Sequence, residues 1–209
     1  KTGELNRLVS DLLEASRTEA RAFATVTSRL DLGQLVQQAV ERARPRADLA
    51  GAEIATRVPT QPVIVEADAA QVGRILDNLL NNAMTYNLSS PRVDLTVSTA
   101  NDQAAVRVAD NGVGIPALER ERIFEQFHRN NEPSFINVPG TGLGLYISRQ
   151  LAEANGGTLA LESSSPQAGT VFLLSLPAVP KTAEAVAADD VLASVGEAVR
   201  ADALAAVER

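Results

Sequence analysis

Two asparagines, Asn78 and Asn82, stand four residues apart in a segment whose apolar residues recur at helical spacing. The segment 68–87 therefore predicts a helix that carries both carboxamides on one face. A carboxamide oxygen is a hard, neutral ligand that suits Mg²⁺ bridging phosphate groups. The alternative is a set of solvent-exposed polar side chains near a helix end, and this segment alone leaves the choice open.

A second group, residues 110–114 (DNGVG), follows a predicted strand. A carboxylate at a strand end can accept a hydrogen bond, and two glycines let the backbone approach a flat ligand closely. An exocyclic amine such as that of adenine is a natural donor to Asp110. A plain Asp-Asn-Gly turn is the alternative.

The third group, residues 140–145 (GTGLGL), runs into a helix predicted over 142–155. Glycines at a helix start expose backbone N–H groups, and the helix dipole adds partial positive charge, so a phosphate group is the expected ligand. The chain has no Gly-Lys pair, which excludes a P-loop, and Leu145 stands where the dinucleotide-binding pattern requires Gly.

Composition excludes several other classes of site. The 209 residues include 19 Lys and Arg against 26 Asp and Glu, a net charge of −7, which argues against nucleic acid or an anionic membrane as the main partner. With no Cys and one His, thiolate chemistry and a metal centre of several histidines are excluded. No apolar run approaches the roughly 18–20 residues of a membrane span. We expect this stretch of the chain to be cytoplasmic without direct membrane contact, whether or not the longer protein is anchored in a membrane. Because the chain begins at Lys1, we expect it to be a piece of a longer protein.

Hydrophobic periodicity predicts the elements that must position these groups. An amphipathic helix over 3–22 comes first, and a second helix follows Asp31, with Pro45 near its end. Because hairpins dominate, we expect an α+β fold with helices on one face of a mixed, largely antiparallel sheet. An Ala-rich tail at 181–209 carries one helical stripe and no residues suited to chemistry. The predicted strands are 53–58, 62–66, 92–99, 103–109, 158–164 and 169–176.

Taken together, the three groups resemble the sensor histidine kinases of two-component systems. The residues Gly156-Gly157 and 169–172 are similar to that family's closing hairpin, and Leu5–Glu19 is similar to the second helix of its dimerisation hairpin. The resemblance covers roughly residues 4–177. The family's asparagine box, first glycine box, phenylalanine box and second glycine box look like residues 78–86, 110–116, 124–127 and 140–145, in that order.

This resemblance implies a Bergerat-type two-layer α/β sandwich of the GHKL superfamily, divided into three regions. Residues 1–28 would form part of the dimerisation hairpin, with its second helix only. Residues 29–178 would form the ATP-binding catalytic domain, and residues 179–209 a helical tail.

The resemblance also implies roles for the matching residues. Asp110 would accept a hydrogen bond from the adenine amino group, Asn82 would hold Mg²⁺ with Asn78 beside it, and backbone N–H groups of the second glycine box would bind phosphate. The ATP-binding residues implied in this way are Asn78, Asn82, Tyr86, Asp110, Gly112, Gly114, Ile115, Arg129, Gly140, Thr141, Gly142, Leu143, Gly144, Leu145 and Thr170.

The chain departs from the family's pattern in three places. Thr85 stands where the family often has Lys, and Arg129 is the one formal cation of the lid implied over 128–141. The phosphoacceptor His of the family lies on the first hairpin helix, and this chain begins after that point. His128 lies in the phenylalanine box, and we interpret it as a side chain at the base of the lid rather than as the acceptor.

Three functions follow from the resemblance and its departures. The first is a histidine kinase catalytic module that uses ATP and Mg²⁺, pairs with a second copy through its N-terminal helix, and signals to a response regulator receiver domain. The second is an ATPase of the gyrase, MutL or chaperone type, in which a Glu occupies the position of Asn78. A carboxamide cannot act as a general base, which favours transfer over hydrolysis. The third is a nucleotide-sensing or scaffold module that transfers no phosphate.

Overall fold

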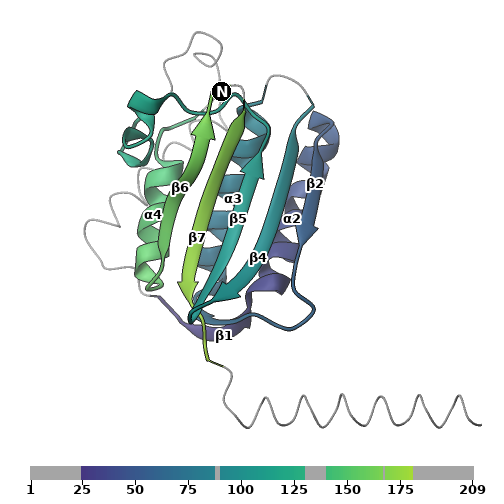
Figure 1. The fold of residues 1–209 in the computed structure, drawn as a ribbon, viewed down its shortest axis with the longest axis vertical. Coiled ribbons are helices and arrows are strands. Elements are labelled where there is room, and N and C mark those ends of the chain that lie inside the picture. The colour runs from purple at the N-terminus through teal and green to yellow at the C-terminus, as the bar shows by residue number, and fades with distance from the viewer. Residues whose placement is uncertain (1–24, 88–89, 130–139, 167, 181–209) are drawn as a thin grey trace, which may run out of the picture. The chain divides into compact units, whose positions relative to one another are not determined.

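The computed structural model describes residues 25–87, 90–129, 140–166 and 168–180. These residues form a strand and three pairs of consecutive strands, separated by helices (Figure 1). In chain order the elements are β1 (Ser28–Asp31), α2 (Leu32–Ala50), β2 (Glu53–Arg57), β3 (Ile64–Ala67), α3 (Ala69–Thr85), β4 (Arg92–Ala100), β5 (Gln103–Asp110), the short 3₁₀ helices η1 (Ala117–Glu119) and η2 (Arg122–Phe124), α4 (Gly144–Ala154), β6 (Thr158–Ser165) and β7 (Gly169–Pro177).

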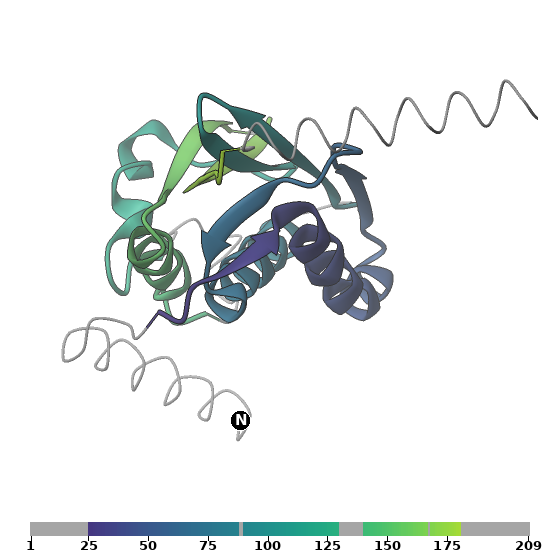
Figure 2. The same cartoon turned by 90° about the horizontal axis from the view of Figure 1, so that it is seen from below.

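The strands form a five-stranded sheet in the order β2-β4-β5-β7-β6, and β1 pairs with β3 in a separate two-stranded sheet. The pair β2–β4 is parallel, whereas the other pairs in both sheets are antiparallel. The helices α2, α3 and α4 form a second layer on one face of the larger sheet, with α3 in the middle (Figure 2). The predicted α+β class, the mixed sheet and the helices on one face are confirmed.

Aspartate side chains fix where the two longer helices begin. Asp31 Oδ1 accepts from the backbone N–H of Gly33 at 2.9 Å, and Asp68 Oδ1 accepts from that of Ala70 at 2.9 Å. Such N-caps satisfy backbone donors that a helix start would otherwise leave unpaired. Both starts were predicted from the sequence, and the start of α3 sets the register of Asn78 and Asn82.

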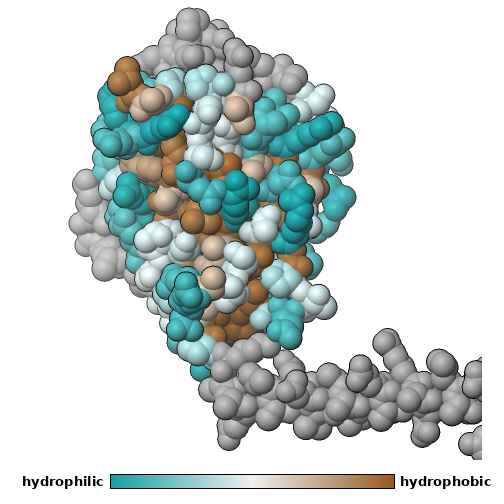
Figure 3. All heavy atoms as spheres, in the orientation of Figure 1, coloured by the Kyte–Doolittle hydropathy of each residue, from teal (hydrophilic) through white to brown (hydrophobic). Residues whose placement is uncertain are grey.

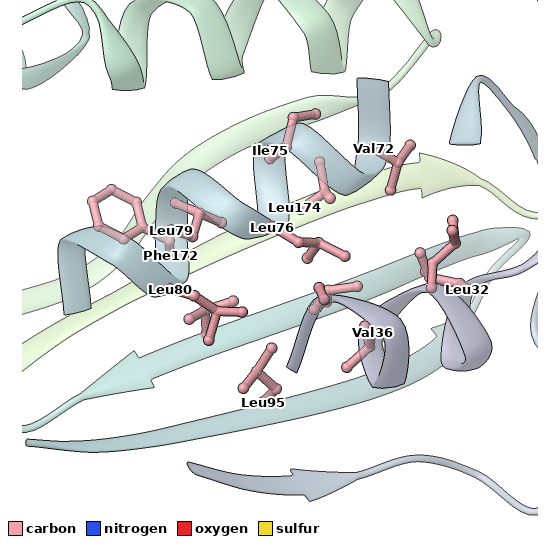
Figure 4. Close-up of a cluster of buried hydrophobic side chains, with 14 of the residues drawn as sticks. Leu32, Val36, Val72, Ile75, Leu76, Leu79, Leu80, Leu95, Phe172 and Leu174 are labelled. Carbon is pink, nitrogen blue, oxygen red and sulfur yellow. The ribbon is translucent and has the colours of Figure 1, made fainter. Parts of the chain in front are cut away.

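The core lies between the sheet and the helix layer. Leu76 and Leu80 of α3 are fully buried, as are Leu95 of β4 and Leu174 of β7 (Figure 4). Full burial of one such side chain contributes about 1.5–3 kcal/mol relative to exposure. These apolar positions hold one face of α3 on the sheet, so that its polar residues face away from the core.

The opposite face of the sheet is open to solvent and mixes hydrophilic with apolar side chains (Figure 3). Exposed ion pairs cross this face, among them Arg107–Glu162 at 2.5 Å and Arg57–Asp94 at 3.3 Å. Such exposed pairs contribute little to stability.

Some elements differ from the sequence predictions. The strand Ser28–Asp31 was not predicted, and β3 pairs with it rather than joining the larger sheet. Helix α2 continues past Pro45 to Ala50, and Gly51, with φ of 62°, ends it. Pro45 lies on an exposed side of the helix, where water can bond the backbone carbonyl that its missing N–H leaves unpaired.

The predicted helices over 3–22 and 181–209 lie outside the described residues, so the three-region division remains a prediction. The chain divides into two units, Lys1–Ala178 and Val179–Arg209, when its residues are grouped by their contacts. Among the described residues, no helix combines the length and apolar character required to cross a membrane.

Candidate functional site

A cavity of about 670 Å³ opens between α3, the start of α4 and the segment that follows β5. The three groups singled out from the sequence meet there, although they lie far apart along the chain. Of the implied ATP-binding residues, all except Gly112 and Leu143 line the cavity. These are Asn78, Asn82, Tyr86, Asp110, Gly114, Ile115, Arg129, Gly140, Thr141, Gly142, Gly144, Leu145 and Thr170.

Asp110 lies at the end of β5 with one carboxylate oxygen already engaged. Its Oδ1 accepts from the backbone N–H of Gly112 at 2.8 Å and from that of Thr170 at 3.2 Å. Burial raises the pKa of the Asp110 carboxyl above its ordinary value of 3.8, and these two hydrogen bonds offset part of that shift. The orientation of the carboxylate is therefore set by the backbone of the loop after β5 and of β7, and no described residue donates to Oδ2, which leaves it for a ligand.

Gly112 does not line the cavity but lies against the backbone of Tyr86 behind it. A Cβ atom at this position would overlap the carbonyl oxygen of Tyr86, the C-cap residue of α3. The neighbouring Val113 donates its backbone N–H to that same carbonyl at 3.2 Å. Glycine here lets the loop after β5 lie directly on the end of α3, which brings Asp110 to one end of the cavity.

A hydroxyl pair supports the same end of the cavity from below. Ser164 Oγ lies 3.1 Å from Thr170 Oγ1 and accepts from the backbone N–H of Ile115 at 2.7 Å. Both side chains are buried, and each finds a polar partner. Thr170 was predicted to lie here, whereas Ser164 was missed.

The two asparagines of α3 are not equivalent. Asn78 Nδ2 donates to Ser148 Oγ of α4 at 2.9 Å, and its carboxamide lies against Gly144. The Asn82 side chain makes no hydrogen bond with any described residue, so its amide oxygen is available to a ligand. Asn82 therefore fits a Mg²⁺ ligand better than Asn78, which α4 holds in place.

The glycine turn before α4 follows a different path from the predicted one. Gly142 has φ of 71°, and a Cβ atom there would overlap the backbone of Phe127 and His128. The Leu143 N–H donates to Thr141 Oγ1 at 3.3 Å, and the Leu143 side chain is 1% exposed. Helix α4 therefore begins at Gly144 instead of residue 142, and Leu143 belongs to the core rather than to the cavity wall. The first turn of α4 still lines the cavity.

The geometry can be compared with that of known proteins. Residues 67–180 match the family model described as histidine kinase-, DNA gyrase B-, and HSP90-like ATPase. The chain belongs to this family.

Curated relatives of this ATPase-family chain are sensor kinases. It is 30% identical over 179 residues to the sensor protein kinase WalK of Staphylococcus saprophyticus. This match covers 85% of the chain and 29% of WalK. It is 36% identical over 179 residues to the sensor histidine kinase MtrB of Mycolicibacterium paratuberculosis. This match covers 84% of the chain and 31% of MtrB. The chain thus spans less than a third of the length of these relatives.

Solved structures of sensor kinases share its fold. Full-length ShkA, solved in complex with AMPPNP, superposes with a TM-score of 0.74 at 31% identity, covering 87% of this chain and 38% of ShkA. The mycobacterial sensor histidine kinase MprB gives a TM-score of 0.62 at 30% identity, covering 74% of this chain and 99% of the MprB chain. The predicted membership of the sensor histidine kinase type of ATP-binding catalytic domain is confirmed.

A contact between His128 and Glu119, and two arginines in the wall of this catalytic domain's cavity, were not predicted from the sequence. His128 Nε2 lies 2.5 Å from Glu119 Oε2, and the two side chains are 8% and 25% exposed. Arg46 and Arg74 also line the cavity, from α2 and α3. No local motif marks Arg46, because its contact with Asn81 joins two helices 35 positions apart in the sequence. His128 lies at the predicted base of the lid, of which residues 130–139 lie outside the described residues.

Proposed function

We propose that this domain binds MgATP and transfers the γ-phosphoryl group to a histidine on another helix. The observation that carries the proposal is a single cavity lined by an oriented acceptor, Asp110, and by the Asn82 carboxamide, which no described residue engages. The first turn of α4 lines the same cavity. The similarity to ShkA, solved in complex with AMPPNP, supports a nucleotide in this cavity.

In the proposed complex, the adenine amino group donates to Asp110, and the base lies near Ile115 and Tyr86. The phosphates run along α3 toward Asn82, whose amide oxygen holds Mg²⁺. The backbone N–H groups at the start of α4 face the same space, where the helix dipole favours anions. Mg²⁺ supplies charge neutralisation between the phosphates when it is bound.

Transfer rather than hydrolysis is supported because each carboxylate that lines the described part of the cavity is either engaged by another side chain or lies at the base end. Asp110 lies at the base end, Asp77 is held by Arg42 in hydrogen bonds of 3.0–3.2 Å, and Glu119 contacts His128. Asn78, one helical turn before Asn82, is a carboxamide that cannot accept a proton from water. Within the described lining, no unengaged carboxylate is positioned to activate a water molecule at the phosphate end.

The proposed reaction needs an acceptor outside this chain. An imidazole nitrogen attacks the γ-phosphorus, the bond from that phosphorus to the β–γ bridging oxygen breaks, and ADP leaves. His128 does not serve as this acceptor, because its Nε2 contacts Glu119 and its side chain is 8% exposed. We propose that the acceptor belongs to the dimerisation hairpin of a second copy or of the longer protein, and that a receiver domain takes the phosphoryl group onward.

Labelled ATP and a separately supplied hairpin that bears the acceptor His test the proposal. We expect acid-labile label on the hairpin, none on the 209-residue chain, and only slow release of phosphate. Rapid phosphate release without label would instead favour the ATPase, and nucleotide binding with neither outcome would favour a sensing module. Acid-labile label on His128 would overturn the assignment of the acceptor.

A further inference from the structure

Arg46 lines the cavity although it lies in α2, outside the segments that resemble the family's motifs. Its Nη1 donates to Asn81 Oδ1 at 2.8 Å, and it makes no ion pair with any described residue. The other two arginines of α2 are neutralised, since Arg42 pairs with Asp77 and Arg44 pairs with Glu41. The partner of Arg46 is neutral, so within the described part of the chain this guanidinium brings an uncompensated positive charge to the cavity.

Helix α3 lies between α2 and α4 (Figure 2). Its polar residues form two rows that face different neighbours. Asn78, in the row that includes Asn82, contacts α4 through Ser148. Asp77 and Asn81, in the adjacent row, contact Arg42 and Arg46 of α2. Residues of both rows line the same cavity. The cavity therefore has a positive feature on each flank of α3, the N-terminus of α4 on one side and Arg46 on the other.

We propose that Arg46 binds a phosphate group of the nucleoside di- or triphosphate from the α2 side of the cavity. The inference rests on the proposed function and extends it to a residue and a flank that the motifs do not cover. Guanidinium carries five donors in a planar fork, of which Asn81 engages one. The remaining N–H groups match phosphate oxygens, and charge-assisted hydrogen bonds of this kind are stronger than neutral ones. In a chain of net charge −7, Arg46 adds a local positive charge that favours binding of a polyphosphate.

The test compares Arg46→Gln with Arg44→Gln in the full 209-residue chain, by calorimetric titration with adenosine, MgADP and MgATP. Both variants remove one charge from the exposed side of α2, but Arg44 does not line the cavity. We expect Arg46→Gln to lose about tenfold in affinity for MgADP and MgATP, with adenosine unchanged. Arg44→Gln should bind all three ligands as the parent does.

The outcomes separate this inference from the proposed function. A parent chain that binds neither MgATP nor MgADP would overturn both. A parent that binds them, with Arg46→Gln unchanged or with an equal loss for adenosine, would overturn the role of Arg46 alone. An equal loss in Arg44→Gln would also overturn it, because the effect would then reflect the general charge of α2.

Two further variants sharpen the test. Asn81→Ala removes the anchor but keeps the cation, so we expect a smaller loss of MgATP affinity than in Arg46→Gln. Thr85 lies one helical turn from Asn81 and also lines the cavity, so Thr85→Lys places an ammonium group on the same wall. We expect Thr85→Lys to restore part of the MgATP affinity lost in Arg46→Gln, and an absence of any restoration would count against a phosphate at this flank.

Discussion

The two ends of the cavity are built in different ways. At the Asp110 end, the oriented group is held by backbone N–H donors from β7 and from the loop after β5, above a buried pair of hydroxyls. At the Asn82 end, the groups are side chains from three helices that meet across the surface of α3. The first arrangement is fixed by the sheet and suits recognition of one flat, neutral group. The second can adjust to a charged, metal-bound group.

The largest expected effect falls on the fixed end. Asp110→Asn keeps the size of the side chain but presents an amide where the adenine amino group needs an acceptor. Loss of a charge-assisted hydrogen bond in a buried place costs about 1.5–3 kcal/mol, which is roughly a tenfold to hundredfold loss of affinity for adenosine and MgATP alike. Calorimetric titration measures both, and adenosine binding equal to that of the parent would remove Asp110 from base recognition.

Asn82→Ala probes the adjustable end. We expect about a tenfold loss for MgATP, because the amide oxygen proposed to hold Mg²⁺ is removed, and no loss for adenosine, which needs no metal. Repeating the MgATP titration over a range of Mg²⁺ concentrations shows whether the loss depends on the metal. A loss that is independent of Mg²⁺ would contradict the assignment of Asn82 as a metal ligand.

The pH dependence should also differ between the two ends. The pKa of Asp110 lies above 3.8 in the folded chain, and a hydrogen bond from adenine favours the ionised carboxylate. Adenosine affinity should therefore be full above the folded-state pKa and fall as the pH is lowered through it. The same series on Asp110→Asn should be flat over that range, and a parallel fall in the variant would assign the pH dependence to another group.

The same raised pKa acts on stability in the opposite direction. Because the folded state holds this proton more tightly than the unfolded state, Asp110 favours folding at low pH, and that contribution is lost as the pH rises through the folded-state pKa. Without ligand, Asp110→Asn should therefore be at least as stable as the parent at neutral pH. Thermal unfolding at two pH values checks the sign, and a variant that is much less stable at neutral pH would contradict it.

The smallest effect is expected at the contact between α3 and α4. Ser148→Ala removes the acceptor that holds Asn78 Nδ2, at a cost of about 1 kcal/mol in the free energy of unfolding. We expect a loss of MgATP affinity of about threefold, with adenosine unaffected, because Asn78 is no longer held beside the metal ligand. A loss of stability with unchanged MgATP affinity would make Ser148 a packing residue only.

The sequence predicted the fixed end better than the adjustable one, and the reason is physical. The Asp110 end depends on a strand end, two glycines and a hairpin, all of which leave local signals. The contact of Arg46 with Asn81 joins residues 35 positions apart on two helices, and no local pattern encodes it. The strand β1 was missed for a related reason, because its four residues are specified by pairing with β3 rather than by their own alternation.

The start of α4 shows how tertiary contacts shift a predicted boundary. The glycine pattern indicated a helix from residue 142, but the backbone of Phe127 and His128 lies where a side chain at Gly142 would be. The positive φ of Gly142 is the conformation that this contact requires, and a residue in that conformation cannot begin the helix. A glycine turn before α4 was thus predicted, and its path depends on a segment remote in sequence.

The double variant Asp110→Asn/Asn82→Ala tests most directly the claim that the two ends act separately. Because the two side chains would contact different parts of one ligand, their effects on MgATP affinity should multiply, as expected for sites that share no partner. For adenosine, the double variant should match Asp110→Asn alone. If Asn82→Ala lowers adenosine affinity as much as MgATP affinity, or if the double variant binds MgATP no more weakly than Asp110→Asn alone, the division of the cavity into a base end and a phosphate end is contradicted.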